Sequence, residues 1–88
     1  MTVGLFNPSI LTLEIFPNPV DNILYIRNPG ETTHFRLFNI LGEQVQELKT
    51  NGDVMIKMNV GNIPSGIYMV AAYNAQNKLI GNARIMKN

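Results

Sequence analysis

The chain has 88 residues, 45% of them hydrophobic and 15% charged, with a formal net charge of +1 and no cysteine. This length allows one small domain, the apolar share is too high for a disordered tail, and the lack of cysteine excludes disulfides and thiolate metal sites. The Lys and Arg residues are scattered, so no basic stripe predicts nucleic-acid binding, and the longest uncharged apolar run, residues 67–73, is far shorter than the roughly 20 residues that span a bilayer.

Residues 1–9 have no clean apolar pattern, and we expect them to be a linker or a frayed end. Met1 is followed by Thr-Val-Gly-Leu without a basic residue, so this stretch is not a secretory signal peptide. If the protein is secreted, its targeting information lies elsewhere, or the chain is a piece of a longer protein.

Seven short apolar segments follow, and their composition favours β-strands. Ten Ile, six Val and five Thr residues suit a pleated surface, whereas only four Ala residues are present to favour a helix. The predicted strands are residues 11–15, 23–27, 35–38, 43–49, 54–58, 67–73 and 78–86. No segment sustains a helical period, and residues 67–73 are apolar on both faces, which predicts the most central strand.

Turn residues separate these strands. Pro17 and Pro19 are expected to end the first strand and to lead the chain to the other sheet, because neither has an N–H to donate. Gly42 is expected to adopt a positive φ, and Asn51-Gly52 is the strongest hairpin signal, joining the fourth strand to the fifth. Strands at this spacing predict an all-β fold, a small antiparallel sandwich.

Candidate groups for catalysis or metal binding are few. The only serines are Ser9 and Ser65 and the only histidine is His34, and we expect them in the linker, in a turn and exposed at a strand edge, respectively. The carboxylates are dispersed rather than spaced as in a calcium loop, and no phosphate-binding loop is present. Five aromatic residues form either a sugar-stacking face or, as we expect, core and cross-strand packing: Tyr25, Phe35, Phe38, Tyr68 and Tyr73.

Four segments, taken in order, resemble one family. They are Phe-Pro-Asn-Pro-Val at residues 16–20, Phe-Asn-Ile-Leu-Gly-Glu-Gln-Val at residues 38–45, Asn-Val-Gly-Asn-Ile-Pro-Ser-Gly-Ile-Tyr-Met-Val at residues 59–70, and Arg-Ile-Met-Lys-Asn at residues 84–88. Each motif alone is weak. Together, at this spacing, they are similar to the type A C-terminal sorting domain of the type IX (Por) secretion system, over about residues 14–88.

The resemblance implies a fold, a function and partners. Members of the family fold as all-β, seven-stranded antiparallel immunoglobulin-like β-sandwiches. The domain is a non-catalytic signal without a cofactor, and it covalently follows a larger cargo protein that enters the periplasm through its own signal peptide. An outer-membrane translocon then exports the cargo, and a sortase-like protease removes the domain and joins the cargo to cell-surface lipopolysaccharide.

The same interpretation assigns the parts of the chain. Residues 1–9 are a linker or cargo-proximal segment, residues 10–88 are the sorting domain, and the cleavage bond lies in or before residues 1–10. The protein is in the periplasm in transit and ends at the outer membrane, at the cell surface or in the medium. The chain is then a piece of a longer protein. The sequence does not decide whether the domain forms a homodimer by edge pairing or strand swapping.

The resemblance singles out eight motif residues: Pro17, Asn18, Pro19, Gly42, Pro64, Ser65, Gly66 and Tyr68. Tyr68 is the candidate for a tyrosine corner, in which its hydroxyl bonds back to the preceding loop. The recognition signal is expected in the last five residues: Arg84, Ile85, Met86, Lys87 and Asn88. A strand that ends at the chain terminus offers an open edge to a receptor, with Lys87 steering by charge.

Two other functions fit the sequence. A generic immunoglobulin-like adhesion or carbohydrate-binding module has the same fold but stays attached wherever it lies in a protein, whereas a sorting domain is C-terminal and removable. A small hydrolase would have to use His34, and a loss of activity in His34→Ala would be needed to support it.

Overall fold

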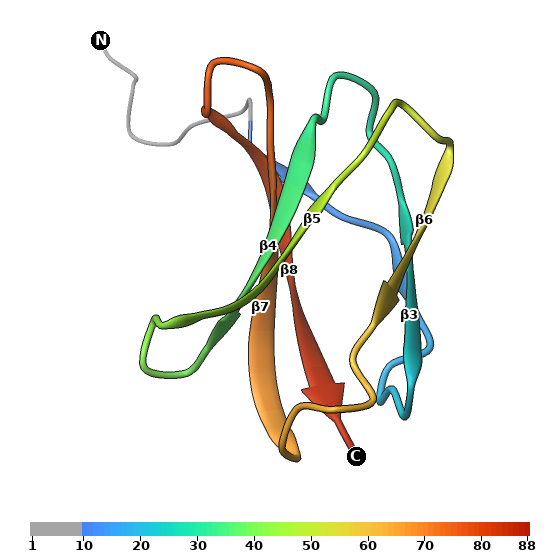
Figure 1. Ribbon diagram of the computed structural model, residues 1–88, viewed down its shortest axis with the longest axis vertical. Helices are drawn as coiled ribbons and strands as arrows, with labels where there is room; N and C mark the ends of the chain where they lie inside the picture. Colours follow the sequence, from blue (N-terminus) through green and yellow to red (C-terminus); the bar gives the residue numbers. More distant parts are fainter. Residues whose placement is uncertain (1–9) are drawn as a thin grey trace, which may run out of the picture.

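The computed structural model describes residues 10–88, which form two layers of β-strands (Figure 1). The eight strands are β1 (Leu11–Thr12), β2 (Ile15–Phe16), β3 (Ile23–Arg27), β4 (His34–Asn39), β5 (Gln44–Lys49), β6 (Met55–Asn59), β7 (Gly66–Tyr73) and β8 (Leu79–Lys87). One sheet has the order β1-β8-β7-β4-β5 and the other has the order β2-β3-β6. The described residues contain no helix, and therefore none long and apolar enough to cross a membrane. The all-β prediction is confirmed, and the predicted linker, residues 1–9, lies outside the described residues.

The core lies between the two sheets, and β7 is the middle strand of the larger one, as its apolar composition predicts. The largest fully buried side chains come from both sheets: Val20, Leu24, Ile26, Phe35, Leu37, Met58, Val60, Val70 and Ile85. Burial of one such side chain contributes about 1.5–3 kcal/mol. This core stabilises the domain without any disulfide, since the chain has no cysteine.

The predicted first strand, residues 11–15, is divided between the two sheets. β1 pairs with β8 in the larger sheet, and β2 pairs with β3 in the smaller one. The switch falls between Leu13, whose N–H donates to the Asn82 carbonyl at 3.0 Å, and Glu14, whose carbonyl accepts from the Arg27 N–H at 2.9 Å. Burial does not follow the predicted alternation, because Leu11 is 47% exposed, whereas Leu13 is buried where the chain crosses between the sheets. Eight strands are therefore present where seven are predicted.

The sheet is also not purely antiparallel. β1 runs parallel to β8, and farther along the chain Val20 forms a parallel bridge with Lys87. The chain thus leaves the larger sheet after β1, forms β2, and returns through Pro17-Asn18-Pro19 to the same edge of the larger sheet. The prolines were predicted to lead the chain to the other sheet, and they do so between β2 and Val20, where the chain returns to the larger sheet. The earlier crossing, from β1 to β2, lies before the prolines. The antiparallel prediction is wrong for this edge because the start of the domain lies alongside its end.

Asn51-Gly52 does not form a hairpin. Gly52 has the positive φ of a turn, 94°, but β5 and β6 lie in different sheets, so the connection crosses between layers. An Asn-Gly pair determines local backbone conformation, and the pairing of the flanking strands depends on the rest of the fold. The hairpins within the larger sheet are β4–β5, around Gly42, and β7–β8. The predicted positive φ of Gly42 is confirmed at 82°.

Candidate functional site

The last strand, β8, is enclosed on both sides. β7 pairs with one edge along its whole length, and β1 pairs with the first half of the other edge, Leu11 opposite Gly81 and Thr12 opposite Asn82. Gly81 allows this close approach, because a Cβ there would lie 2.8 Å from the carbonyl oxygen of Leu11. The first half of β8 therefore has no open edge.

The Pro-Asn-Pro motif closes the second half of that edge. Both of its X-Pro peptide bonds, Phe16-Pro17 and Asn18-Pro19, are cis. The Asn18 Nδ2 atom donates to the carbonyl of Arg84 at 3.3 Å, and Oδ1 accepts from the N–H of Met86 at 2.9 Å. Because the prolines have no N–H, the amide side chain between them supplies the donor and acceptor that a neighbouring strand would supply.

The segment after the motif continues this contact to the end of the chain. The Val20 N–H donates to the Met86 carbonyl at 2.8 Å, and the Asn88 N–H donates to the Val20 carbonyl at 2.9 Å. Asn88 also donates through Nδ2 to Asp21 Oδ1 at 2.9 Å. The first and last motifs thus form one hydrogen-bonded unit, and the expectation that the terminal strand offers an open edge at residues 84–88 is wrong. The sequence signal for this unit was an amide side chain between two prolines, which sequence reasoning did not use.

The five predicted signal residues differ in what they expose. Ile85 is only 1% exposed and belongs to the core, whereas Arg84, Met86 and Asn88 point away from it and are exposed. Since the backbone of this segment is paired on both sides, its outward side chains, rather than its backbone, are accessible while the domain stays folded.

The predicted tyrosine corner is confirmed. The Tyr68 hydroxyl donates to the carbonyl of Pro64 at 2.7 Å, and the side chain is buried. Pro64 and Ser65 are exposed, and Gly66 has a positive φ of 148°. Tyr68 lies opposite Ile85 in the β7–β8 register, so the corner orders the backbone beside the C-terminal segment.

The turn between β4 and β5 is held by backbone bonds, from the Asn39 N–H to the Glu43 carbonyl and from the Gly42 N–H to the Asn39 carbonyl, and by the Asn39 side chain. Asn39 Oδ1 accepts from the N–H groups of Leu41 and Glu43, both at 3.0 Å, and Asn39 Nδ2 donates to Glu43 Oε1 at 2.8 Å. The tip of this fixed turn presents two large apolar residues to solvent, Ile40 at 77% exposure and Leu41 at 79%. Sequence reasoning selected Gly42 in this motif and missed the two exposed residues before it.

All four motifs meet at one end of the five-stranded sheet. In the strand register, Asn39 of β4 lies opposite Tyr68 of β7, which lies opposite Ile85 of β8. The Pro-Asn-Pro motif contacts β8 at the same level through Asn18. In Figure 1 this is the lower end of the molecule, where β8 ends and the β4–β5 turn projects. We call it the motif end.

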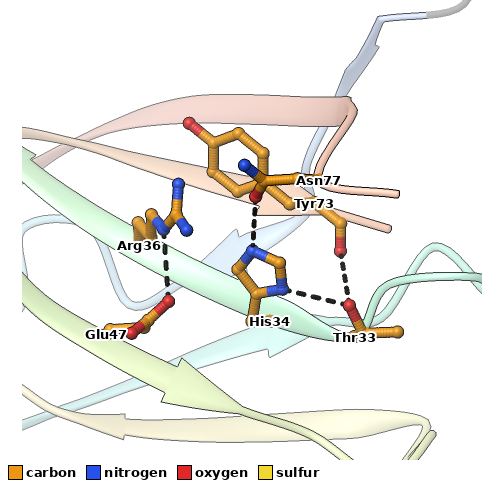
Figure 2. Close-up of polar contacts among 6 residues, drawn as sticks. All are labelled: Thr33, His34, Arg36, Glu47, Tyr73 and Asn77. Atoms are coloured by element: carbon orange, nitrogen blue, oxygen red, sulfur yellow. Dashed lines mark hydrogen bonds and ion pairs between the residues drawn. The ribbon is translucent and has the colours of Figure 1, made fainter. Parts of the chain in front are cut away.

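The opposite end of the sheet carries the histidine. Figure 2 shows the contacts among Thr33, His34, Arg36, Glu47, Tyr73 and Asn77. The His34 and Tyr73 rings are stacked, with centroids 5.3 Å apart and planes at 9°, and the Arg36 guanidinium lies 4.7 Å from the centre of the Tyr73 ring. His34 Nδ1 lies 3.0 Å from Thr33 Oγ1 and Nε2 lies 3.1 Å from Asn77 Oδ1, while Arg36 pairs with Glu47 at 3.2 Å. These side chains are thus stacked, hydrogen-bonded or ion-paired with one another.

The hydrolase hypothesis requires a serine beside the histidine, and the structure does not bring Ser65 and His34 together. Ser65 precedes β7, whereas His34 lies opposite Tyr73 at the far end of the same strand. The two are separated by the length of β7, about 25 Å at the usual rise of a strand. Ser9 lies outside the described residues.

The aromatic residues do not share a sugar-stacking face either. Phe35 and Tyr68 are buried in the core. Tyr25 belongs to the other sheet, where it stacks on Phe16 at 5.5 Å. Tyr73 lies in the polar cluster of Figure 2, so most of these rings serve core or cross-strand packing, as expected.

A model of the secretion system C-terminal sorting domain matches residues 14–87, nearly the whole described chain. The chain belongs to this family, and it is a C-terminal sorting domain of the type IX secretion system. As such it is a sorting signal attached to a cargo protein, it interacts with the type IX secretion machinery, and it directs export to the outer membrane, the cell surface or the medium. No curated protein and no solved structure compared with the chain gave a match.

Proposed function

We propose that the domain is a non-catalytic signal that an outer-membrane translocon reads at the motif end, during transit of the cargo through the periplasm. The observation that carries this proposal is the convergence of all four motifs. Residues far apart in sequence, such as Asn18 and Met86, are hydrogen-bonded there. Packing of the core alone does not require outward side chains at that end, so the arrangement supports a surface that a partner reads.

The recognition signal includes the last five residues, Arg84, Ile85, Met86, Lys87 and Asn88. Their outward side chains make the contact, and Ile85 anchors the segment in the core. Deletion of all five would remove this anchor together with the bonds to Asn18 and Val20, so it would destabilise the fold as well as the signal. Single outward substitutions are the cleaner test.

After export, a sortase-like protease removes the domain and joins the cargo to lipopolysaccharide. The cleavage bond lies in or before residues 1–10, upstream of Leu11. In support, β1 is paired with β8 from Leu11 onward, so a bond beyond that point is held in the sheet. Residues 10–88 then remain together as the removed sorting domain.

The free edges of the sheets determine which strands a homodimer could pair. The free edges of the larger sheet are β5 and the outer side of β1, and β8 is enclosed. A homodimer by edge pairing could use β1 or β5 in the larger sheet, or β2 or β6 in the smaller one. β1 and β2 have only two residues each, and β5 carries charged and amide side chains that oppose such pairing. We also propose that the sandwich is immunoglobulin-like. The hydrogen bond from the Tyr68 hydroxyl to the Pro64 carbonyl, a tyrosine corner, supports this classification.

The test joins the 88-residue chain to the C-terminus of a reporter with a periplasmic signal peptide, in a bacterium that has the type IX system. We expect the reporter at the cell surface, separated from the domain and linked to lipopolysaccharide. Deletion of the translocon in the same host is the control, and it should hold the reporter in the periplasm. A reporter that stays in the periplasm of the intact host, or reaches the surface with the domain still attached, would favour a binding module instead.

A further inference from the structure

The outer face of the five-stranded sheet is apolar at the motif end. Phe38 of β4, Met69 of β7 and Arg84 of β8 are register neighbours in one row, and Ile67 and Met86 form the next row. The side chains between them in sequence, Tyr68 and Ile85, point into the core, so those of the two rows point outward. Ile67, Met69 and Met86 are each 38–47% exposed.

The β4–β5 turn forms a wall beside these rows. Together they enclose a shallow hollow of about 410 Å³ that is lined by Phe38, Ile40, Ile67, Met69 and Arg84, among others. The wall is fixed by the Asn39 side chain, so Ile40 and Leu41 are held exposed rather than left free to fold onto the sheet. A preformed apolar hollow with a rigid rim is a surface that gains free energy when a partner covers it. We call it the motif-end hollow.

A single cation lies in this hollow. No carboxylate lines it, and among the described residues the ion pairs are Arg27–Glu14 and Arg36–Glu47, so Arg84 has no acidic partner there. Covering an unpaired guanidinium with apolar surface removes its hydration and costs free energy unless the partner supplies a carboxylate. Charge complementarity with Arg84 therefore favours an occupant that carries a carboxylate.

We propose that the motif-end hollow docks a protein of the secretion machinery that presents apolar side chains around one carboxylate. This rests on the function proposed above and adds the chemistry of the partner. An anionic lipid surface fits less well, because recognition of such a surface takes a cluster of several basic residues and the hollow offers one. A second copy of the chain fits less well because its own hollow brings another Arg84 and no carboxylate.

The apolar part is tested by export of the reporter fusion. Leu41→Lys and Met69→Lys each place a charge on the hollow or its rim, and Val54→Lys is the matched control, since Val54 is 70% exposed on the connection before β6. We expect the surface-displayed reporter to fall about tenfold for the first two variants and to stay at the wild-type level for the control. Each purified 88-residue variant should melt within about 2 °C of wild type, because these positions are exposed.

The charge is tested at Arg84. We expect Arg84→Glu to reduce export most, Arg84→Met to reduce it about tenfold or less, and Arg84→Lys to retain most of it. Lys57→Glu, at an exposed position of β6 in the other sheet, is the control for net charge. Export of Arg84→Met at or above the wild-type level would show that the partner has no carboxylate and would overturn that part of the proposal.

The remaining outcomes separate the proposals from each other. Wild-type export together with normal export of Leu41→Lys and Met69→Lys would overturn the docking surface and leave the sorting function in place. Failure of the wild-type fusion itself would overturn the sorting function. Two measurements on the purified chain complete the test: a dimer that Leu41→Lys dissociates, or flotation with phosphatidylglycerol vesicles that Leu41→Lys abolishes, would assign the hollow to a second copy or to lipid and overturn the proposal.

Discussion

The two ends of the five-stranded sheet carry contrasting outer faces. At the His34 end, side chains on neighbouring strands interact with one another. The His34 and Tyr73 rings are stacked, and the Arg36 guanidinium lies over the Tyr73 ring and pairs with the Glu47 carboxylate. At the motif end, apolar side chains and Arg84 face outward, and no carboxylate of the described residues pairs with Arg84. The outer face of this sheet thus has one end where polar side chains are paired within the domain. At the other end, exposed apolar side chains lie beside a cation that has no acidic partner among the described residues. Each of the following variants tests this distinction.

The largest effect on stability is expected from Ile85→Ala. The side chain is 1% exposed, and its removal leaves a cavity in the core beside Tyr68, so the free energy of unfolding should fall by about 2–5 kcal/mol. Urea denaturation of the purified chain measures this. Met86→Ala, one residue on but 47% exposed, is the matched control, and it should change stability by less than about 0.5 kcal/mol while reducing export. Equal loss of stability in both variants would show that the alternation of β8 is misassigned.

The next effect is expected from Asn18→Ala. It removes two hydrogen bonds to the β8 backbone, to the Arg84 carbonyl and from the Met86 N–H, and the free energy of unfolding should fall by about 1–2 kcal/mol. Hydrogen exchange should show faster exchange of the Met86 amide, with little change at the Val70 amide in the middle of β7. If the Met86 amide stays protected, the proposed role of Asn18 as a replacement for a strand is wrong.

Tyr68→Phe should cost about 1 kcal/mol, because the hydroxyl that bonds to the Pro64 carbonyl is lost while the ring stays in the core. The melting midpoint of the purified chain checks this, and Tyr25→Phe, whose ring stacks on Phe16 in the other sheet, is the control. An unchanged midpoint in Tyr68→Phe would mean that the corner contributes nothing to stability.

The smallest effect is expected at the opposite end. Tyr73→Leu removes the stack with His34 and the contact with Arg36, which should lower the free energy of unfolding by about 0.5–1 kcal/mol. Export of the reporter fusion should stay unchanged, since these side chains need no partner. A strong export defect in a variant that is still folded would contradict the assignment of recognition to the motif end.

Local signals predicted the strands well. Strands β3 to β8 lie within one residue of the ranges expected from apolar pattern and turn residues, and the central place of β7 follows from its two apolar faces. The positive φ of Gly42 and the Tyr68 corner were also predictable, because each depends on residues near in sequence. Such features need only local geometry.

The pairing of strands was less predictable. Residues 11–15 alternate like one strand, yet the chain crosses between sheets at Leu13, and Asn51-Gly52 has the chemistry of a hairpin but joins two layers. The edge of β8 is closed by Asn18, 66 residues before Arg84, through a side-chain amide that no periodicity reveals. Gly81 within a strand was the available sign that another backbone lies close to it.

The most direct test of the central claim is site-specific photocrosslinking in cells that are exporting the reporter fusion. A photoreactive phenylalanine analogue placed at Leu41, on the motif end, is compared with the same analogue at Tyr73, on the opposite end. We expect position 41 to crosslink to a component of the type IX machinery, identified by mass spectrometry, and position 73 not to crosslink. Crosslinking from position 73 alone, or equally from both positions, would contradict the central claim.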